Sequence, residues 1–164
     1  MDVTMRAASI IDSFILLSWR NSLSARESSQ SSHKIELEEH EKWLKARIDR
    51  HHNEPFWIFS MSENLVGYVR FEVSKERPAT CNVSIFVAEE YQGRGLGKKM
   101  LNFAFLDLVS KSSFSEIRAV IRKNNFRSKH LFTSFGFVFS KQLDSNFSEY
   151  LVLPNNMNLH EIHF

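Results

Sequence analysis

Three stretches in the middle of the chain alternate between apolar and polar positions with a period of two. They cover residues 55–61, 65–73 and 80–87 and are rich in β-branched and aromatic side chains. Such runs predict β-strands, and the polar segments 62–64 and 74–79 between them predict turns. We therefore expect an antiparallel meander of three strands.

Two stretches near the start carry apolar residues at helical spacing. A helix capped by Ser9 is predicted to end near Asn21, and a second helix covers residues 36–51, with acidic residues early and basic residues late. The serine-rich residues 22–34 between them predict a mobile loop. One face of the second helix is predicted from spacing alone: Leu37, His40, Trp43, Leu44 and Ile48.

The second half alternates between helix and strand patterns. Residues 96–111 hold too many apolar side chains for a surface helix and predict a largely buried one. A short helix is expected to end at Gly136, a residue type that often ends helices. The remaining predicted elements are a strand at 116–122, that short helix at 124–135, and a hairpin from 137–143 and 148–154.

With one further strand expected before the first helix, this order of elements predicts an α/β protein with mixed topology: a mostly antiparallel, seven-stranded sheet flanked by about four helices. The step from strand 80–87 through helix 96–111 to strand 116–122 is a right-handed crossover between parallel strands. With 164 residues and no repeat or linker, residues 1–164 are expected to form a single domain. Its core would cover about 3–153, and 155–164 would be a tail.

Composition narrows the function classes. A net charge of +2 without a long basic block argues against a nucleic-acid partner. The apolar stretch near the start contains Asp12 and is too short to span a bilayer, so we expect no membrane association. The single cysteine, Cys81, suits a reducing compartment and a cytoplasmic location. Among the histidines, His51 and His52 are adjacent and point apart, while His160 and His163 lie in the tail, so no metal site is expected.

Three glycines in five positions, Gly93, Gly95 and Gly97, lie between a predicted strand and a predicted helix. The first amides of a helix have no partner inside it, so a bare backbone there can bind a phosphate. Lys98 and Lys99 would add favourable charge. A P-loop would require a serine or threonine where Lys99 stands, and a dinucleotide fold would place its glycines early in a repeated parallel sheet.

Two motifs here resemble the GNAT superfamily of N-acetyltransferases. Gln92-x-x-Gly95-x-Gly97 resembles its acetyl-CoA pyrophosphate loop, and Asn125-x-x-Ser128-x-x-x-Phe132-x-x-x-Gly136-Phe137 resembles its later helix motif. The resemblance covers about residues 3–153 and implies the GNAT fold, with acetyl-CoA as co-substrate and no metal. It implies that the pantetheine arm pairs with the strand at Ile85, Phe86 and Val87. It further implies pyrophosphate contacts from Gln92, Gly93, Arg94, Gly95, Leu96, Gly97 and Lys98, and cofactor contacts from Asn125, Arg127 and Lys129.

Acetyl transfer to an amine requires removal of a proton, a donor for the oxyanion and relief of charge on the leaving thiolate. The backbone N–H of Val87, or a neighbouring one, is the expected oxyanion donor, and His40 and Glu72 are the candidate bases. Each could instead have a purely structural role, since His40 could stack on a tryptophan and Glu72 could lie on a solvent-exposed face of the sheet. Many relatives have a tyrosine where this chain has Phe132, so Ser128, Ser134 or water would have to protonate the thiolate, or it leaves unassisted. Cys81 is expected to be a core residue rather than a nucleophile.

The first third of the chain resembles a narrower GNAT branch. Leu17-x-Trp19-Arg20-Asn21, Arg26 and Ile35-x-x-Glu38-Glu39-His40-x-x-Trp43 are similar to sugar-nucleotide N-acetyltransferases of the pseudaminic-acid pathway and to Rim-type protein N-terminal acetyltransferases. Arginines suit a diphosphate and tryptophans a sugar or uracil ring, although both tryptophans could equally be core anchors. The first hypothesis is therefore an amino-sugar nucleotide as acceptor. The alternatives are a protein N-terminus or another small amine, and a non-catalytic acyl-CoA-binding module; a homodimer is left open. Expected acceptor-site residues are Trp19, Arg20, Asn21, His40, Trp43 and Arg70.

Overall fold

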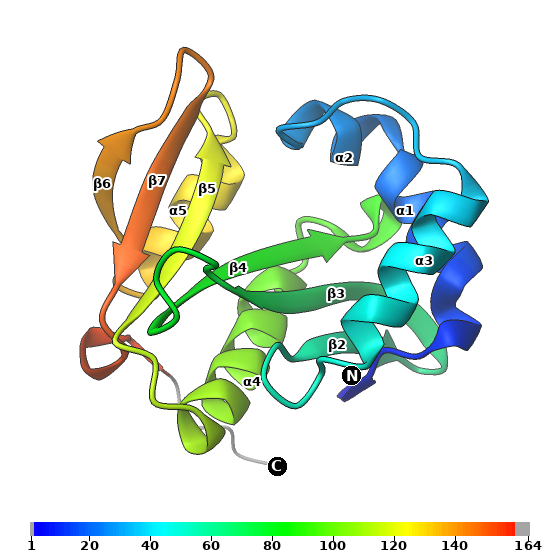
Figure 1. The fold of residues 1–164 in the computed structure, drawn as a ribbon, viewed down its shortest axis with the longest axis horizontal. Helices are drawn as coiled ribbons and strands as arrows, with labels where there is room; N and C mark the ends of the chain where they lie inside the picture. Colours follow the sequence, from blue (N-terminus) through cyan, green and yellow to red (C-terminus); the bar gives the residue numbers. More distant parts are fainter. Residues whose placement is uncertain (1, 160–164) are drawn as a thin grey trace.

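A single mixed sheet organises the chain in the computed structural model, which describes residues 2–159 (Figure 1). The strand order is β1-β2-β3-β4-β5-β7-β6, and only β4 and β5 pair in parallel. The expected seven-stranded, mostly antiparallel sheet is confirmed. The strands are β1 Val3–Ala7, β2 Phe56–Met61, β3 Asn64–Val73, β4 Thr80–Val87, β5 Glu116–Arg122, β6 Val138–Gln142 and β7 Phe147–Val152.

The described residues form five α-helices, one more than the roughly four expected. They are α1 Ser13–Asn21, α2 Leu23–Ser28, α3 Leu37–Ile48, α4 Leu96–Lys111 and α5 Phe126–Ser134, with short 3-10 turns at Ile10–Asp12, Glu89–Tyr91 and Pro154–Asn156. Helix α2 could not be predicted from the sequence, because its six residues are too few to show a clear apolar period. Its start is capped by the Ser22 hydroxyl, which accepts the Ala25 N–H at 3.3 Å.

The prediction of a mobile loop over 22–34 is therefore wrong for its first half, and the rest is tied to the fold. The Asn21 side chain donates to the Ile35 carbonyl at 2.8 Å and accepts the Ile35 N–H at 2.9 Å. Arg20 donates to the Ser31 carbonyl at 2.8 Å. These polar links replace the apolar packing that a serine-rich segment cannot supply.

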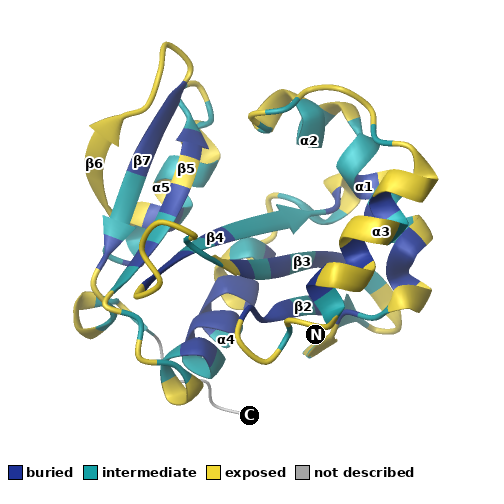
Figure 2. Cartoon of the chain, in the orientation of Figure 1, coloured by how far each residue is buried: buried dark blue, intermediate teal, exposed yellow. Residues whose placement is uncertain are grey.

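Strand alternation sends side chains to two separate cores. On one face, α4 and α5 cover Phe59, Val69 and Val83 with their neighbours. On the other face, α1 and α3 cover Phe56 and Ile58, together with Tyr68 and Phe86. Figure 2 shows the buried stripe along α4 and the fully exposed edge strand β6.

Helix α3 rests on the sheet through an ion pair as well as apolar contacts. Arg47 is fully buried, forms a salt bridge with Glu54 and donates to the Phe71 carbonyl of β3. The predicted face of α3 is partly wrong, because Leu37 and Trp43 are 38% and 36% exposed. Arg47 is buried on this face instead. Its burial was not expected from the sequence, because a charged side chain is rarely buried without a partner, and the partner Glu54 could not be identified.

Strands β4 and β5 pair only near their starts. The parallel register joins Thr80–Asn82 to residues 116–118, and no later pair is recorded between the two described strands. Figure 1 shows β5, β7 and β6 turning away from β4 beyond this point. The later residues of β4 therefore present an edge that β5 does not cover.

The tail expected at 155–164 is partly structured. Asn158 donates to the Phe135 carbonyl at 3.2 Å, and Met157 and Leu159 pack against the core under α4. Residues 160–164, including His160 and His163, lie outside the described residues. Within residues 2–159, no helix is long and apolar enough to cross a membrane.

Candidate active site

The glycine loop between β4 and α4 leaves its backbone uncovered. Gly93 and Gly95 adopt the left-handed conformation, with φ of 76° and 75°, which side-chain-bearing residues rarely adopt. No described atom lies within 4 Å of the place where a Cβ would stand at either position. Gly97 is different, because its Cβ would lie 3.3 Å from Leu131 Cδ2 of α5. Two of the three glycines therefore face open space, and the third allows two helices to pack.

Some of the amides predicted to bind pyrophosphate already have acceptors in the protein. The Gln92 N–H donates to the Glu89 carbonyl at 3.2 Å, and the Lys98 N–H to the Gly95 carbonyl at 3.2 Å. The amides between them, from Gly93 to Gly97, include the first two of α4, which have no acceptor inside the helix. The loop therefore offers a shorter anion site than the range 92–98, at the positive end of the 16-residue helix α4.

The Gln92 side chain fastens the loop to two other elements. Its Nε2 donates to the Val87 carbonyl at 2.8 Å, and its Oε1 accepts a hydrogen bond from Arg127 of α5. Gln92 thus holds the loop against the end of β4 and fixes Arg127 beside it. The basic side chains nearest the loop, Arg94, Lys98 and Lys99, are exposed.

The register of β3 and β4 decides which backbone groups of β4 face the uncovered edge. Ala88 donates to the Val66 carbonyl at 2.9 Å. Because hydrogen-bonded and non-bonded pairs alternate in an antiparallel ladder, the N–H groups of Ile85 and Val87 point away from β3. Phe86 pairs with Tyr68 in that ladder, so its backbone is already engaged. Of the three residues expected to contact pantetheine, Ile85 and Val87 direct their N–H groups toward the uncovered edge, while the Val87 carbonyl accepts the hydrogen bond from Gln92.

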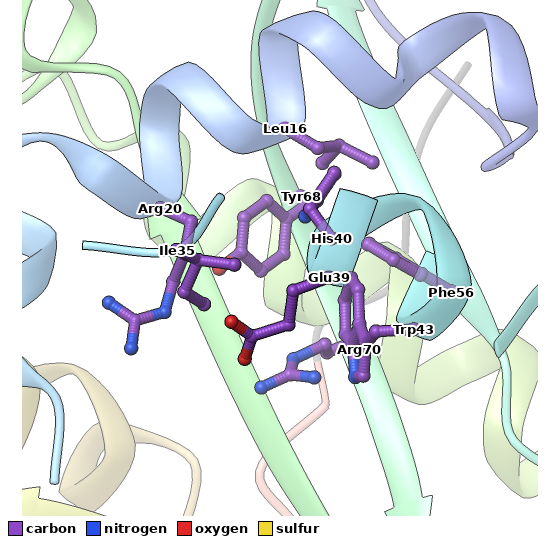
Figure 3. Close-up of a pocket in the computed structure, with 9 residues that line it drawn as sticks. All are labelled: Leu16, Arg20, Ile35, Glu39, His40, Trp43, Phe56, Tyr68 and Arg70. Atoms are coloured by element: carbon purple, nitrogen blue, oxygen red, sulfur yellow. The ribbon is translucent and has the colours of Figure 1, made fainter. Parts of the chain in front are cut away.

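A cavity of about 170 Å³ lies on the other face of the sheet, between α1, α3 and β3 (Figure 3). Four of the residues expected at the acceptor site line it: Arg20, His40, Trp43 and Arg70. The Arg70 guanidinium lies over the Trp43 ring, 5.2 Å from its centroid. Tyr68 connects the cavity to β4, since its ring stacks on Phe86 at 5.7 Å between centroids.

Two other predicted acceptor residues have structural roles instead. Trp19 is buried, with its ring centroid 5.5 Å from that of Phe86, and it does not line the cavity. The Asn21 side chain forms hydrogen bonds with both the carbonyl and the N–H of Ile35. The interpretation of Trp19 as a core anchor fits this placement.

His40 is buried in the wall of the cavity. Its ring lies 5.5 Å from that of Trp43, and its Nε2 has no hydrogen-bond partner among the described residues. Burial lowers the pKa of His40, against smaller opposing effects of the Ser13 backbone and Glu41. His40 is therefore neutral at pH 7 and retains a buried ring nitrogen without a partner among the described residues.

The structure does not bring Glu72 to this cavity. Glu72 is exposed and pairs with Asn82 on β4, five residues before Val87 and thus about 17 Å from it along the strand. Cys81 is fully buried, and burial raises the pKa of its thiol to about 12. This environment matches a core residue, because the thiol form does not act as a nucleophile.

The later motif lies on α5, beside the glycine loop. Asn125 caps this helix by accepting the Ser128 N–H at 3.0 Å, and Lys129 donates to the Lys123 carbonyl at 2.6 Å. Phe132 is buried against Phe137, with 5.1 Å between ring centroids. The Ser134 hydroxyl donates to the Leu131 carbonyl at 2.7 Å. Of the expected cofactor residues on α5, Arg127 has the direct link to the loop.

Sequence reasoning missed five lining residues of the cavity. Tyr68 had a usable signal, because strand alternation places it on the face of Arg70. Ile35 and Glu39 belong to the motif around His40 that resembles the narrower branch, but they were not assigned to the acceptor site. The complete set of missed residues is Leu16, Ile35, Glu39, Phe56 and Tyr68. Within residues 2–159, no group of three or more His, Cys, Asp or Glu side chains could hold a metal ion.

Comparisons with known proteins fit the fold and the uncovered loop. The model of the acetyltransferase (GNAT) family matches residues 17–137. This chain belongs to the acetyltransferase (GNAT) family. The narrower branch, with sugar-nucleotide and Rim-type enzymes, stays a prediction.

Three relatives illustrate the similarity. A spermine/spermidine N(1)-acetyltransferase of Bacillus subtilis (strain 168) is 39% identical over 67 residues, which are 41% of this chain and 44% of that protein. The chain thus matches less than half the length of this curated relative. The spermidine N-acetyltransferase from Vibrio cholerae, solved with CoA and spermine, superposes with a TM-score of 0.80 at 18% identity over 94% of this chain and 96% of that one. The acetyltransferase yncA from Salmonella typhimurium, solved with acetyl-CoA, gives a TM-score of 0.78 at 19% identity over 93% and 94%. At these identities, the two structures show the shared fold.

Proposed function

We propose that this chain is an acetyl-CoA-dependent N-acetyltransferase that transfers acetyl directly from the thioester to a primary amine. The observation that carries the proposal is the open space over Gly93 and Gly95 at the start of α4. Amides of residues 93–97 would hold the pyrophosphate, and the uncovered edge at Ile85 and Val87 would pair with the pantetheine amides. Arg127, fixed by Gln92, would face the nucleotide end.

Acetyl-CoA would supply an activated acyl group, and the protein would supply positioning and charge stabilisation. The amine nitrogen forms a bond to the thioester carbonyl carbon, the carbon–sulfur bond breaks, and CoA leaves with the electron pair. A backbone N–H on the uncovered edge, that of Val87 or Ile85, would stabilise the oxyanion. Because Phe132 has no hydroxyl and the Ser134 hydroxyl donates to the Leu131 carbonyl, Ser128 or water would protonate the thiolate.

His40 is the candidate base. It lines the cavity, is neutral at pH 7 because its pKa is lowered, and keeps Nε2 without a protein partner. A neutral imidazole can accept the proton that the amine must lose before or during attack. Glu72 is exposed and does not line the cavity.

For the acceptor, our first proposal is an amino-sugar nucleotide. Arg20 and Arg70 supply cations for its diphosphate, and Trp43 supplies a flat face for a ring. A polyamine is the second candidate, because the partial match to a spermine/spermidine N(1)-acetyltransferase favours it. Glu39 at the cavity would be the counter-charge for such a substrate. A protein N-terminus stays a prediction from the sequence.

Thiol release from acetyl-CoA tests these proposals. The panel should contain a uridine-diphosphate amino sugar, spermidine and a peptide beginning with alanine, with mass spectrometry of each product. Our first proposal expects a product heavier by one acetyl group from the amino-sugar nucleotide. Modification of spermidine or the peptide alone would overturn that acceptor. Binding of acetyl-CoA without any turnover would support the non-catalytic alternative instead.

A further inference from the structure

The acceptor cavity contains buried hydrogen-bond donors that the protein does not use. Arg20 Nη1 and Arg70 Nε are both buried and have no hydrogen-bond partner among the described residues. Both residues line the cavity, as does His40, whose Nε2 is likewise unpartnered. Leaving a charged donor buried without an acceptor is costly, so a site with two such donors suits a ligand that brings oxygen acceptors.

Both guanidinium groups are held in place by the protein. Arg20 donates through Nη2 to the Ser31 carbonyl at 2.8 Å, which leaves Nη1 for another acceptor. Arg70 lies over the Trp43 ring at 5.2 Å. Because the two side chains are already ordered, binding an anion to them costs less conformational entropy than it would with mobile arginines.

The acidic residue of the cavity does not neutralise these cations. Glu39 is the one carboxylate among the nine lining residues, and it is exposed. Figure 3 shows its carboxylate and both guanidinium groups directed toward the same side of the cavity. No ion pair within 4.0 Å joins Glu39 to Arg20 or Arg70. With His40 uncharged, the lining carries two positive charges against one negative charge.

Building on the proposed N-acetyl transfer, we propose that the acceptor amine carries an anionic oxygen group, a phosphate or carboxylate, which binds Arg20 and Arg70. An amino-sugar phosphate, an amino-sugar nucleotide or an amino acid fits this description. A free polyamine brings only cations to two fixed guanidinium groups, so it is a poor ligand for the cavity. Glu39 then lies where it can attract the ammonium form of the same molecule.

Matched pairs of amines test this selectivity through thiol release from acetyl-CoA. Glucosamine 6-phosphate and glucosamine share one amine and differ by a phosphate; γ-aminobutyrate and propylamine differ by a carboxylate. In at least one pair, we expect the amine with the phosphate or carboxylate to exceed its partner without that group by about tenfold or more in kcat/KM, the scale of one charge-assisted hydrogen bond. Spermidine should be a worse substrate than that member.

Two variants connect the preference to the arginines. Arg20→Met and Arg70→Met should each lower the ratio of kcat/KM between the amine with the phosphate or carboxylate and its partner without that group toward one. Arg77→Met is the matched control, since Arg77 is exposed in the turn between β3 and β4 and does not line the cavity. It should keep the wild-type ratio. Circular dichroism shows whether each variant folds.

Failure of this inference can be distinguished from failure of N-acetyl transfer. If spermidine exceeds every anionic amine, or if both arginine variants keep the wild-type ratio, the inference is overturned while N-acetyl transfer stands. If acetyl-CoA binds by calorimetry but no amine reacts, the proposed transfer fails. Calorimetry with glucosamine 6-phosphate and with γ-aminobutyrate then decides the anion site by itself. Binding of either probe to wild type that weakens in Arg20→Met supports the site, and no binding of either probe overturns it.

Discussion

Single residues decide whether the glycine loop can hold a phosphate. Gly95 combines a left-handed backbone with open space around it, whereas Gly97 faces Leu131 of α5. The same residue type therefore has two functions within five positions. One leaves room for a ligand, and the other leaves room for a neighbouring helix.

Gly95→Val should abolish acetyl-CoA binding while the fold is retained. A branched side chain would occupy the space expected for a phosphate oxygen, and the left-handed backbone would add strain of about 1–2 kcal/mol. Gly95→Asn is the matched control, because asparagine tolerates this conformation but also fills the space. Calorimetry should show weakened binding for both variants, with a larger loss of thermal stability for valine. Normal binding by Gly95→Asn would contradict the assignment of this loop.

His40 should make stability depend on pH near neutrality. Its pKa is lowered in the folded state, so the unfolded chain binds a proton more readily. The contribution of His40 is complete above the unfolded pKa near 6.5 and is lost as the pH falls below it. Urea unfolding from about pH 7.5 to about pH 5.5 should give a steeper loss for wild type than for His40→Gln. Equal slopes would show that His40 is not buried as a neutral group.

Several elements could be predicted closely from sequence, and others could not. Strand 80–87, helix 96–111 and strand 116–122 match β4, α4 and β5, because each is rich in apolar residues and is bounded by polar or glycine-rich segments. Helix α2 was not predicted because a capping serine and hydrogen bonds from Arg26 and Arg122 stabilise it rather than an apolar stripe. The face of α3 was misjudged because the Arg47–Glu54 pair buries a cation.

The contact between β4, the glycine loop and α5 depends on Gln92. Gln92→Leu removes the hydrogen bond to the Val87 carbonyl and leaves Arg127 without this partner. Each lost bond is worth about 1 kcal/mol, so the dissociation constant for acetyl-CoA should rise by about tenfold. Calorimetry measures the change. Gln142→Leu on the exposed strand β6 is the control and should bind like wild type. Wild-type affinity in Gln92→Leu would mean that the loop keeps its geometry without this link.

At the scale of the whole molecule, one sheet connects two hydrophobic cores. Strands β2, β3 and β4 contribute side chains to both faces, so neither core can be lost without disrupting the other. The single-domain organisation and a cytoplasmic location stay predictions from the sequence. The parting of β4 and β5 after residues 82 and 118 gives the molecule its exposed strand edge.

Unfolding should therefore be a single cooperative transition. Trp19 lies in the core under α1 and α3, and Trp57 packs against the core under α4, so tryptophan fluorescence reports on both. Urea titrations followed by fluorescence and by far-ultraviolet circular dichroism should give coincident midpoints. Two separated transitions would show that the two cores unfold independently.

The sequence by itself determined the strands, most helices, the phosphate-type loop and the family, because these depend on local periodicity and on residue spacing within short motifs. Only the tertiary structure decided which donors remain free. The β3–β4 register engages Phe86 and turns the N–H groups of Ile85 and Val87 away from β3, and the packing of α1 on α3 brings Arg20 to a cavity with Arg70. Whether a polar atom is satisfied depends on neighbours that are distant in sequence, and that is why the cavity could not be read from the chain alone.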